Sequence, residues 1–345
     1  MAQQNILVFL PSPMGDAIMA TPALRSIRQT FASSRIIFCA NETVKQILTP
    51  CAFCDDWIVP SWRNPFSLAK IFKDYDFNQA ILLKNSISSA AAVFLARIPI
   101  RIGYDREMRG IFLTEKLTPA RASASKYKPT PATDYYMAIA AWLGCDTSNH
   151  QTHLDIDTSS TQAVLEKYSD ILQASRPVVI LVPGGAFGPS KCWPEQNFAA
   201  TADYLIEKHN AHVFVSVAPV DAEKKIADKI CASAKGEVIN LGNAGLNLSQ
   251  LKALFSFATI IITNDTGPRH IAIALGRKVI TMFGPNDPAW TQNQYTHEKK
   301  IIADVDCAPC NRPICKEPEH ICMASITPQM ICAAADEMLK ADSDE

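Results

Sequence analysis

The chain carries little charge for its length and has no long apolar run. Charged side chains make up 19% of its 345 residues, and the formal net charge is −1. So small a charge argues against a nucleic-acid-binding protein that relies on phosphate contacts. No apolar stretch approaches the ~20 residues that a membrane-spanning helix needs. The segment Met1–Asn5 lacks the basic start of a signal peptide, so we expect a cytoplasmic protein.

The chain also lacks the signs of a disulfide framework. Its eleven cysteines are an odd number, which in a cytoplasmic protein predicts reduced thiols. Four lie near the C-terminus with His320 among them, a spacing that could hold a structural zinc ion but is not the paired C-x2-C of a zinc ribbon. We prefer a metal-free loop of buried thiols, and we expect no metal and no cofactor. The four are Cys307, Cys310, Cys315 and Cys322.

The length and the order of the elements predict two α/β domains. At about 150 residues each, 345 residues suffice for two domains, and 48% hydrophobic residues indicate large cores. Strand and helix signals alternate from end to end, which is typical of parallel sheets covered by helices. The polar stretch 155–160 and the helix after it form the passage between the halves. We therefore expect domains at 1–165 and 166–345, with a last helix that could pack back on the first domain.

Short apolar runs and turn residues locate the main elements. In the first half they predict strands at 6–10, 35–40 and 79–83, helices at 17–30 and 135–143, and a long surface loop at 118–133. In the second half they predict strands at 177–182, 212–217, 260–262 and 279–283, and helices at 197–209 and 270–275.

Each half opens with a strand followed by a glycine-bearing loop, at 11–16 and at 183–188. In open α/β sheets the ligand lies at the carboxyl ends of the strands. We therefore expect two Rossmann-like domains facing across a cleft that holds the active site. The first loop contains only Gly15 and lacks G-x-G-x-x-G, which argues against a dinucleotide.

The turn Asn264–Gly267 is the strongest local signal. It joins a buried strand to a helix, so its free backbone N–H groups could bind an anion, most plausibly a phosphate. Gly267 would let the ligand approach the backbone closely. An ordinary helix cap explains the same residues equally well, because Asp and Thr are common caps.

Two single residues could carry chemistry. Asp16 ends the first loop just before a helix, where it could be a general base or a plain N-cap. Lys191 follows the second glycine-bearing loop and could offer its charge to a diphosphate, or be a solvated surface lysine.

A basic segment spans 97–128, with eight Lys or Arg against three acidic residues. It could be a solvated face, or it could receive an anionic acceptor or an anionic membrane surface. Its basic residues are Arg97, Arg101, Arg106, Arg109, Lys116, Arg121, Lys126 and Lys128.

Several motifs together resemble one enzyme family over nearly the whole chain. They are Met14-Gly15-Asp16, Leu83-Lys84-Asn85-Ser86, Arg101-Ile102-Gly103, Pro183-Gly184-Gly185, Lys191-Cys192-Trp193-Pro194, the stretch from Asn264 to His270, and the stretch from Phe283 to Pro288. The set resembles glycosyltransferase family 9, the ADP-heptose:lipopolysaccharide heptosyltransferases, and within it the heptosyltransferase II branch. The resemblance implies a GT-B fold, with the acceptor on the N-terminal domain and the donor on the C-terminal domain.

The resemblance also implies a reaction: inverting, metal-independent transfer of L-glycero-D-manno-heptose from ADP-heptose to the heptosyl-Kdo-lipid A inner core of lipopolysaccharide. Asp16 matches the general base. Lys191, with Ser190 assisting, matches the residue that stabilises the departing diphosphate. Thr266 and Gly267 match backbone donors at the helix N-terminus, which would stabilise the charge that grows on the leaving group.

Other site residues follow from motif position or topology. Asp265 and His270 occupy motif positions on the donor side, and Glu223 is placed near the ribose from topology. Cys192 replaces a usual arginine, and we hypothesise that Arg269, which replaces a usual apolar residue, compensates by binding the donor. The expected acceptor-binding residues are Met14, Gly15, Asn85, Arg101, Arg106 and Arg109.

Alternatives remain open. The chain could add the first heptose to Kdo, as heptosyltransferase I does, or it could be a non-catalytic sugar-nucleotide-binding protein. An epimerase or a dinucleotide-dependent enzyme on a related fold is a further possibility. The expected partners are ADP-heptose, the lipid acceptor and the cytoplasmic face of the inner membrane as a peripheral contact, without nucleic acid.

Overall fold

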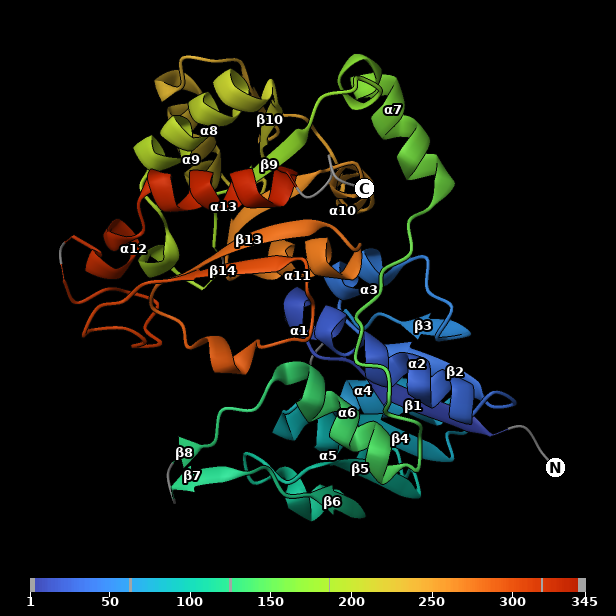
Figure 1. The fold of residues 1–345 in the computed structure, drawn as a ribbon. Helices are drawn as coiled ribbons and strands as arrows, with labels where there is room; N and C mark the ends of the chain where they lie inside the picture. Colours follow the sequence, from blue (N-terminus) through green and yellow to red (C-terminus); the bar gives the residue numbers. More distant parts are fainter. Residues whose placement is uncertain (1–3, 62–63, 124–125, 186, 318, 341–345) are drawn as a thin grey trace. The chain divides into compact units, whose positions relative to one another are not determined.

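The computed structural model describes residues 4–340, apart from 62–63, 124–125, 186 and 318. The chain forms two compact units, one of Met1–Asp155 with Ala289–Gln294 and one of Ile156–Pro288 with Tyr295–Glu345. Each unit is a parallel sheet with helices packed on it (Figure 1). The predicted α/β class is therefore confirmed.

The first unit is built on a six-stranded sheet in the order β3-β2-β1-β4-β5-β6, all parallel. Its strands are β1 Asn5–Phe9, β2 Arg35–Cys39, β3 Asp56–Ile58, β4 Gln79–Leu82, β5 Ile100–Tyr104 and β6 Glu115–Leu117. Its helices are α1 Met14–Met19, α2 Thr21–Thr30, α3 Glu42–Leu48, α4 Pro65–Lys73, α5 Ile87–Leu95, the short 3-10 helix η1 Arg109–Phe112 and α6 Ala132–Trp142.

Alternation along the strands divides the core of this unit between two faces. Leu7 and Phe9 of β1 point to the same face, where they pack with Leu68 and Phe72 of α4 in one apolar cluster. The rings of Phe9 and Phe72 meet edge to face, with centroids 6.1 Å apart. Ile6 and the other alternate strand residues are equally buried, so the sheet is covered on both faces.

The helix expected at 17–30 is two helices, α1 and α2. Ala20 ends the first and precedes the second, and Pro22 lies in the first turn of α2. A proline is tolerated there because the N–H that it lacks has no partner within the helix. The chain enters α1 at Met14, so Asp16 lies in its first turn.

The long surface loop expected at 118–133 is also partly wrong. It contains a short antiparallel hairpin of β7 Arg121–Ser123 and β8 Lys126–Tyr127. Residues 124 and 125, between the two strands, lie outside the described residues. The helix that follows begins at Ala132, three residues earlier than expected.

The second unit repeats the same strand order, β11-β10-β9-β12-β13-β14, again all parallel. Its strands are β9 Val178–Val182, β10 His212–Val215, β11 Val238–Asn240, β12 Ile260–Asn264, β13 Lys278–Phe283 and β14 Glu298–Ile302. Its helices are α7 Thr158–Leu172, η2 Pro189–Lys191, α8 Glu195–His209, α9 Asp221–Ser233, α10 Leu248–Ser256, α11 Gly267–Ala274, α12 Ile321–Ser325 and α13 Pro328–Lys340. The 3-10 turn η3 Pro288–Trp290 leads into the short segment that belongs to the first unit.

The last helix, α13, packs within its own unit. Its residues Ile331 and Ala335 share an apolar cluster with Phe198 of α8. Asp336 of α13 accepts a hydrogen bond from the hydroxyl of Tyr204 on α8, at 2.8 Å. No helix in the described part of the chain is both long and apolar enough to span a membrane.

In both sheets the first and fourth strands of the unit are neighbours, β1 beside β4 and β9 beside β12, and the order of the strands reverses there. In doubly wound sheets such a point leaves a crevice at the carboxyl ends of the two strands, where ligands bind. The segments after these four strands carry the predicted residues Asp16, Asn85, Lys191 and Asp265.

Candidate active site

The first unit contains a cavity of about 460 Å³ at this point of its sheet. Asp16 comes from the first turn of α1, Asn85 from the loop after β4, and Arg106 from the loop after β5. Tyr127 of the hairpin and Tyr135 of α6 also line it. Thus three predicted residues from three separate segments line one cavity.

Among the described residues, Asp16 is one of two carboxylates that line this cavity, with Asp134. Burial raises the pKa of Asp16 from 3.8 to about 6, because the ionised form loses hydration. In the described part of the chain no cation forms an ion pair with Asp16. A carboxylate with a pKa near 6 can accept a proton close to neutral pH, as a general base must.

Arg106 and Lys128 are basic residues that line the cavity. The guanidinium of Arg106 lies 4.0 Å from the ring centroid of Tyr127 and 5.9 Å from that of Tyr135. Its Nε is buried and has no hydrogen-bond partner among the described residues. A stacked guanidinium with an unused N–H is suited to bind a carboxylate or phosphate of a ligand.

Asn85 is held in place by Arg109, which we had expected to bind the acceptor itself. Arg109 is fully buried, and its Nη2 donates to Oδ1 of Asn85 at 2.8 Å while its Nε donates to the carbonyl of Tyr104, also at 2.8 Å. The Tyr135 hydroxyl donates to the same Asn85 oxygen, at 3.2 Å. In this structure Arg109 therefore fixes the wall of the cavity from within the fold.

The other expected acceptor residues lie elsewhere. Arg101 donates from Nε to the carbonyl of Phe112 and from Nη1 to that of Ile98, each at 2.6 Å, and so ties η1 to the end of α5. Met14 and Gly15 lie in the first turn of α1. None of the three is among the described residues that line the cavity.

In the second unit, Lys191 lies at the corresponding crevice. It is nearly buried, and its Nζ donates to the backbone carbonyl of Asp265 at 2.5 Å and lies 3.7 Å from Oδ2 of the same residue. The ring of Phe187 is 4.8 Å away. Burial lowers the pKa of Lys191, although Asp265 opposes that effect. The alternative prediction that Lys191 is a solvated surface residue is therefore wrong.

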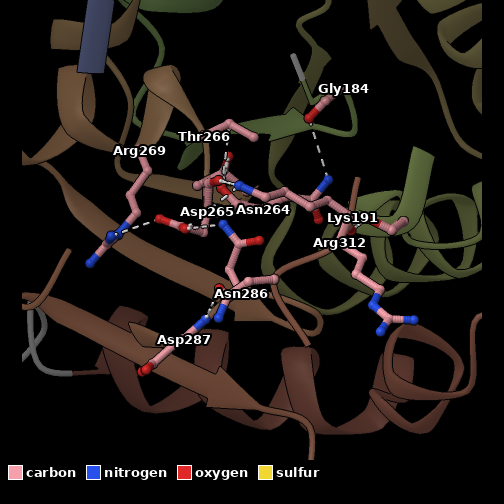
Figure 2. Close-up of polar contacts among 12 residues, drawn as sticks. Gly184, Lys191, Asn264, Asp265, Thr266, Arg269, Asn286, Asp287 and Arg312 are labelled. Carbon is pink, nitrogen blue, oxygen red and sulfur yellow. Dashed lines mark hydrogen bonds and ion pairs between the residues drawn. The ribbon is translucent and has the colours of Figure 1, made fainter. Parts of the chain in front are cut away.

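Asp265 lies between cations and an amide (Figure 2). Its Oδ1 accepts from Nη1 of Arg269 at 2.9 Å, and its Oδ2 accepts from Nδ2 of Asn286 at 3.1 Å. Burial alone would raise the pKa of Asp265, but the charges of Arg269 and Lys191 hold it below its usual value. Asp265 is thus a permanent anion that organises its neighbours.

The turn after β12 is tied to the glycine-bearing loop after β9. Asn264 donates from Nδ2 to the carbonyl of Pro183 at 3.0 Å, and a Cβ built on Gly185 would be 3.5 Å from Thr266. Thr266 occupies the N-cap of α11 without capping it by its side chain, and Gly267 is the first residue of the helix. Pro268 has no N–H, and the N–H of Arg269 donates to the carbonyl of Thr266 at 3.1 Å, so an anion would bind to the N–H groups of Thr266 and Gly267.

Two further predicted donor residues border this turn. The carboxylate of Glu223, on α9, accepts from the N–H of Ala218 at 2.8 Å and lies so close to Gly184 that a Cβ there would meet it at 2.3 Å. Ser190 is nearly buried, and its hydroxyl donates to the carbonyl of Arg312 at 2.6 Å. Glu223 therefore lies against the glycine-bearing loop, whereas Ser190 anchors that loop to Arg312.

His270 and Arg269 are directed into the fold. Burial, with the charge of Arg269 added, lowers the pKa of His270 to about 4, so it is neutral at physiological pH. Arg269 is fully buried and forms ion pairs with Asp265 and Glu298. Its predicted role as a direct donor ligand does not agree with this burial.

The cysteine-rich segment lies beside the same crevice. Its Pro313 carbonyl accepts the N–H of Ser190 at 3.2 Å, and Asn311 accepts the N–H of Asp287 at 3.0 Å. Burial raises the pKa of Cys322, and the nearby thiols of Cys307, Cys315 and Cys310 add to that effect. Among the described residues, no three His, Cys, Asp or Glu side chains are grouped so that they could hold a metal ion.

Sequence reasoning missed part of both sites. It treated Tyr135 only as a helix residue, and it did not recognise Tyr127, because the hairpin that presents it was taken for a loop. It also missed Glu298, the partner of Arg269. The available signal for Glu298 was an arginine in a buried helix, which requires a carboxylate nearby.

Comparison with known proteins places the chain in one family. The family model for "Glycosyltransferase family 9 (heptosyltransferase)" matches residues 66–321. Lipooligosaccharide heptosyltransferase 2 of Haemophilus influenzae is 27% identical over 301 residues, which are 83% of this chain and 85% of that protein.

Two solved structures share the fold. A glycosyltransferase family 9 protein from Veillonella parvula superposes with a TM-score of 0.83 at 22% identity, covering 98% of this chain and 97% of that one. ADP-heptose lipopolysaccharide heptosyltransferase II of Escherichia coli superposes with a TM-score of 0.79 at 23% identity, covering 99% and 100%. The chain is thus a GT-B glycosyltransferase that belongs to glycosyltransferase family 9, the heptosyltransferases.

Proposed function

We propose that this chain transfers heptose from ADP-heptose to a heptosyl-Kdo-lipid A acceptor of the lipopolysaccharide inner core, as a heptosyltransferase II. The observation that carries the proposal is the cavity in which Asp16, with its raised pKa, faces the same space as Arg106. The curated relatives named heptosyltransferase 2 support the choice of donor and acceptor.

In the proposed reaction Asp16 removes the proton from an acceptor hydroxyl as that oxygen attacks the anomeric carbon of the donor. The new glycosidic C–O bond forms on the face opposite the departing diphosphate, so the anomeric configuration inverts. The bond to the β-phosphate oxygen breaks, and its electron pair leaves with ADP. The acceptor proton ends on the Asp16 carboxylate and then passes to solvent.

Binding of the acceptor rests on Arg106 and Asn85. The inner core carries carboxylates and phosphates, and the stacked guanidinium of Arg106 has an N–H free for one of them. Asn85 offers an amide to sugar hydroxyls and is kept rigid by Arg109 and Tyr135. A rigid polar group loses little entropy when it binds a ligand.

The donor side rests on the turn after β12. Lys191 and the N–H groups at Thr266 and Gly267 receive the negative charge that grows on the diphosphate as the bond breaks. Glu223, beside Gly184, accepts hydrogen bonds from the ribose hydroxyls.

An assay with defined acceptors tests the proposal. Purified protein is incubated with ADP-heptose and either heptosyl-Kdo-lipid A or Kdo-lipid A, and ADP release and the mass of the lipid product are followed. We expect transfer to the heptosylated acceptor. Preference for Kdo-lipid A would assign the chain to first-heptose addition, and nucleotide binding without transfer to either would identify a non-catalytic binding protein.

Peripheral contact with the membrane is proposed for one surface of the first unit. Large apolar side chains with exposed fractions from 46% to 86% lie on α5 and beside η1. They are Ile87, Phe94, Met108 and Ile111, here called the α5–η1 patch. The rings of Phe94 on α5 and Phe112 on η1 have centroids 5.5 Å apart, so α5 and η1 lie side by side, and we propose that these exposed side chains form one surface. Such a patch is suited to the headgroup region of a bilayer that contains the acceptor.

Vesicle co-sedimentation tests this contact. The double variant Met108→Asn/Ile111→Ser should bind anionic vesicles less than the wild type. The variant Val220→Ser/Ile302→Ser, which removes two exposed apolar residues of the second unit, serves as the control. Equal binding by all three proteins would refute the proposed surface.

A further inference from the structure

The whole guanidinium group of Arg269 is buried beside the turn after β12. Arg269, on the first turn of α11, has no exposed surface. Nε and Nη2 donate to the two carboxylate oxygens of Glu298 at 2.6 and 3.0 Å, while Nη1 donates to Asp265 at 2.9 Å. Arg269 therefore cannot touch a bound nucleotide without unfolding of its surroundings, and its effect on a ligand must pass through a neighbour.

Glu298 fixes the position of Arg269 from the edge strand β14. Its carboxylate is fully buried and also accepts from the hydroxyl of Thr281 at 2.6 Å, and Nζ of Lys300 lies 3.7 Å away. A planar guanidinium held by two parallel bonds has one orientation only. Its third donor group is thereby aimed at Asp265, the residue before the N-cap of α11.

Asp265 in turn governs the charge of Lys191. One of its oxygens is occupied by Arg269 and the other by Asn286, so Lys191 lies 3.7 Å from the carboxylate and bonds to the backbone carbonyl (Figure 2). Arg269 and Lys191 are both permanent cations whose charges lower the pKa of Asp265, so without Arg269 more of the carboxylate's charge would act on Lys191. The ammonium would then be neutralised by Asp265, and it would attract an anionic ligand less strongly.

We propose that Arg269, oriented by Glu298, is a positioning residue that takes up the charge of Asp265 and so leaves the charge of Lys191 for the diphosphate of a nucleotide donor. This inference rests on the proposed donor site. The positioning role differs from direct binding of the nucleotide by Arg269. It predicts that nucleotide affinity falls when the positive charge of Arg269 is removed, but not when the negative charge of its partner Glu298 is removed.

Two variants separate this role from a merely structural one. Arg269→Met and Glu298→Gln break the same buried pair, and both should lower the melting temperature, since either leaves a buried charge without its partner. They leave opposite charges, however. ADP affinity measured by calorimetry at pH 8 should fall about tenfold or more in Arg269→Met and stay within about twofold of wild type in Glu298→Gln.

Conservative and matched variants complete the set. Arg269→Lys keeps the positive charge without the planar fork, so it should recover part of the lost ADP affinity. Arg277→Met removes another arginine just beyond α11, whose Nε donates to the carbonyl of Leu275, and should leave ADP affinity unchanged.

The outcomes distinguish this inference from the proposed function. Unchanged ADP affinity in Arg269→Met, or parallel losses of affinity in Arg269→Met and Glu298→Gln, would overturn the positioning role while the donor assignment stands. If the wild type binds UDP or GDP in place of ADP, the proposed donor is wrong and the same variants are compared with that nucleotide. A wild type that binds none of the three overturns both.

Discussion

Two carboxylates that follow strands at the switch points of the two sheets have opposite properties. Asp16 follows β1 and Asp265 follows β12, so each lies at the point where its sheet reverses its direction of growth. Burial raises the pKa of Asp16, to about 6. Asp265 is buried as well, yet Arg269 and Lys191 hold its pKa below the usual value.

The difference shows that strand order determines where a functional side chain lies, while neighbouring charges determine what it can do. A carboxylate that is desolvated and lacks a cation binds a proton readily, so Asp16 suits a general base. A carboxylate between two cations stays ionised and holds its neighbours in place. In the proposed reaction the first unit therefore carries the group that reacts, and the second carries a fixed electrostatic frame.

Replacing the reactive carboxylate should have the largest effect. Asp16→Asn keeps the shape of the side chain but cannot accept the proton, so kcat should fall by about 10³-fold. Donor affinity should not change, because the donor residues lie in the other unit. Steady-state kinetics and calorimetry with ADP measure the two quantities.

The stability of the same variant provides its control. The ionised Asp16 costs stability above its folded pKa, since that pKa exceeds the unfolded value, and an amide removes the cost. Asp16→Asn should therefore melt at or above the wild-type temperature at pH 8. Glu42→Gln, at an exposed first-turn carboxylate of α3, should leave kcat unchanged. Full activity in Asp16→Asn would show that the base lies elsewhere.

Removing the positive charge of Lys191 should have the next largest effect on kcat. Lys191→Met should lower kcat by about 10²-fold, because the charge of the leaving diphosphate grows in the transition state. The exposed Lys229, which pairs with Glu195, gives the control Lys229→Met. A variant that raises the donor KM without lowering kcat would show that Lys191 binds donor and transition state equally.

The acceptor cavity predicts a smaller, selective effect. Arg106→Leu removes the stacked guanidinium, and the acceptor KM should rise by about 10- to 30-fold with the donor KM unchanged, as expected for loss of a charged hydrogen bond. Lys116→Met, at an exposed basic residue of β6, controls for net charge. Equal acceptor KM values for wild type and Arg106→Leu would remove Arg106 from the site.

Much of this arrangement could be predicted from the sequence, and the limits have physical causes. The alternation of strands and helices predicted the α/β class, and the motif set predicted the family, because both depend on local patterns. The break between α1 and α2 was signalled by Pro22 but was hidden by a continuous apolar periodicity. The hairpin that presents Tyr127 is too short and too polar for periodicity to detect.

Side-chain partners were harder to predict than positions. Nothing local distinguishes Arg106, which enters a cavity, from Arg109, which is buried three residues later. Arg269 was expected to meet the donor, yet it pairs with Glu298, which is 29 residues away in the chain. Such pairings depend on the register of β13 and β14, which no single segment contains.

The pH dependence should separate the two carboxylates without any substitution. The diphosphate of ADP-heptose has no proton to gain near neutral pH, Asp265 remains ionised, and His270, with a pKa of about 4, remains neutral. The donor KM should therefore be flat from pH 8 to pH 5. Asp16, with its pKa of about 6, becomes protonated in that range, so kcat should be about tenfold lower at pH 5 than at pH 8. If the donor KM rises as kcat falls, the titrating group lies in the second unit. The contrast between a reactive Asp16 and a permanently ionised Asp265 would then be wrong.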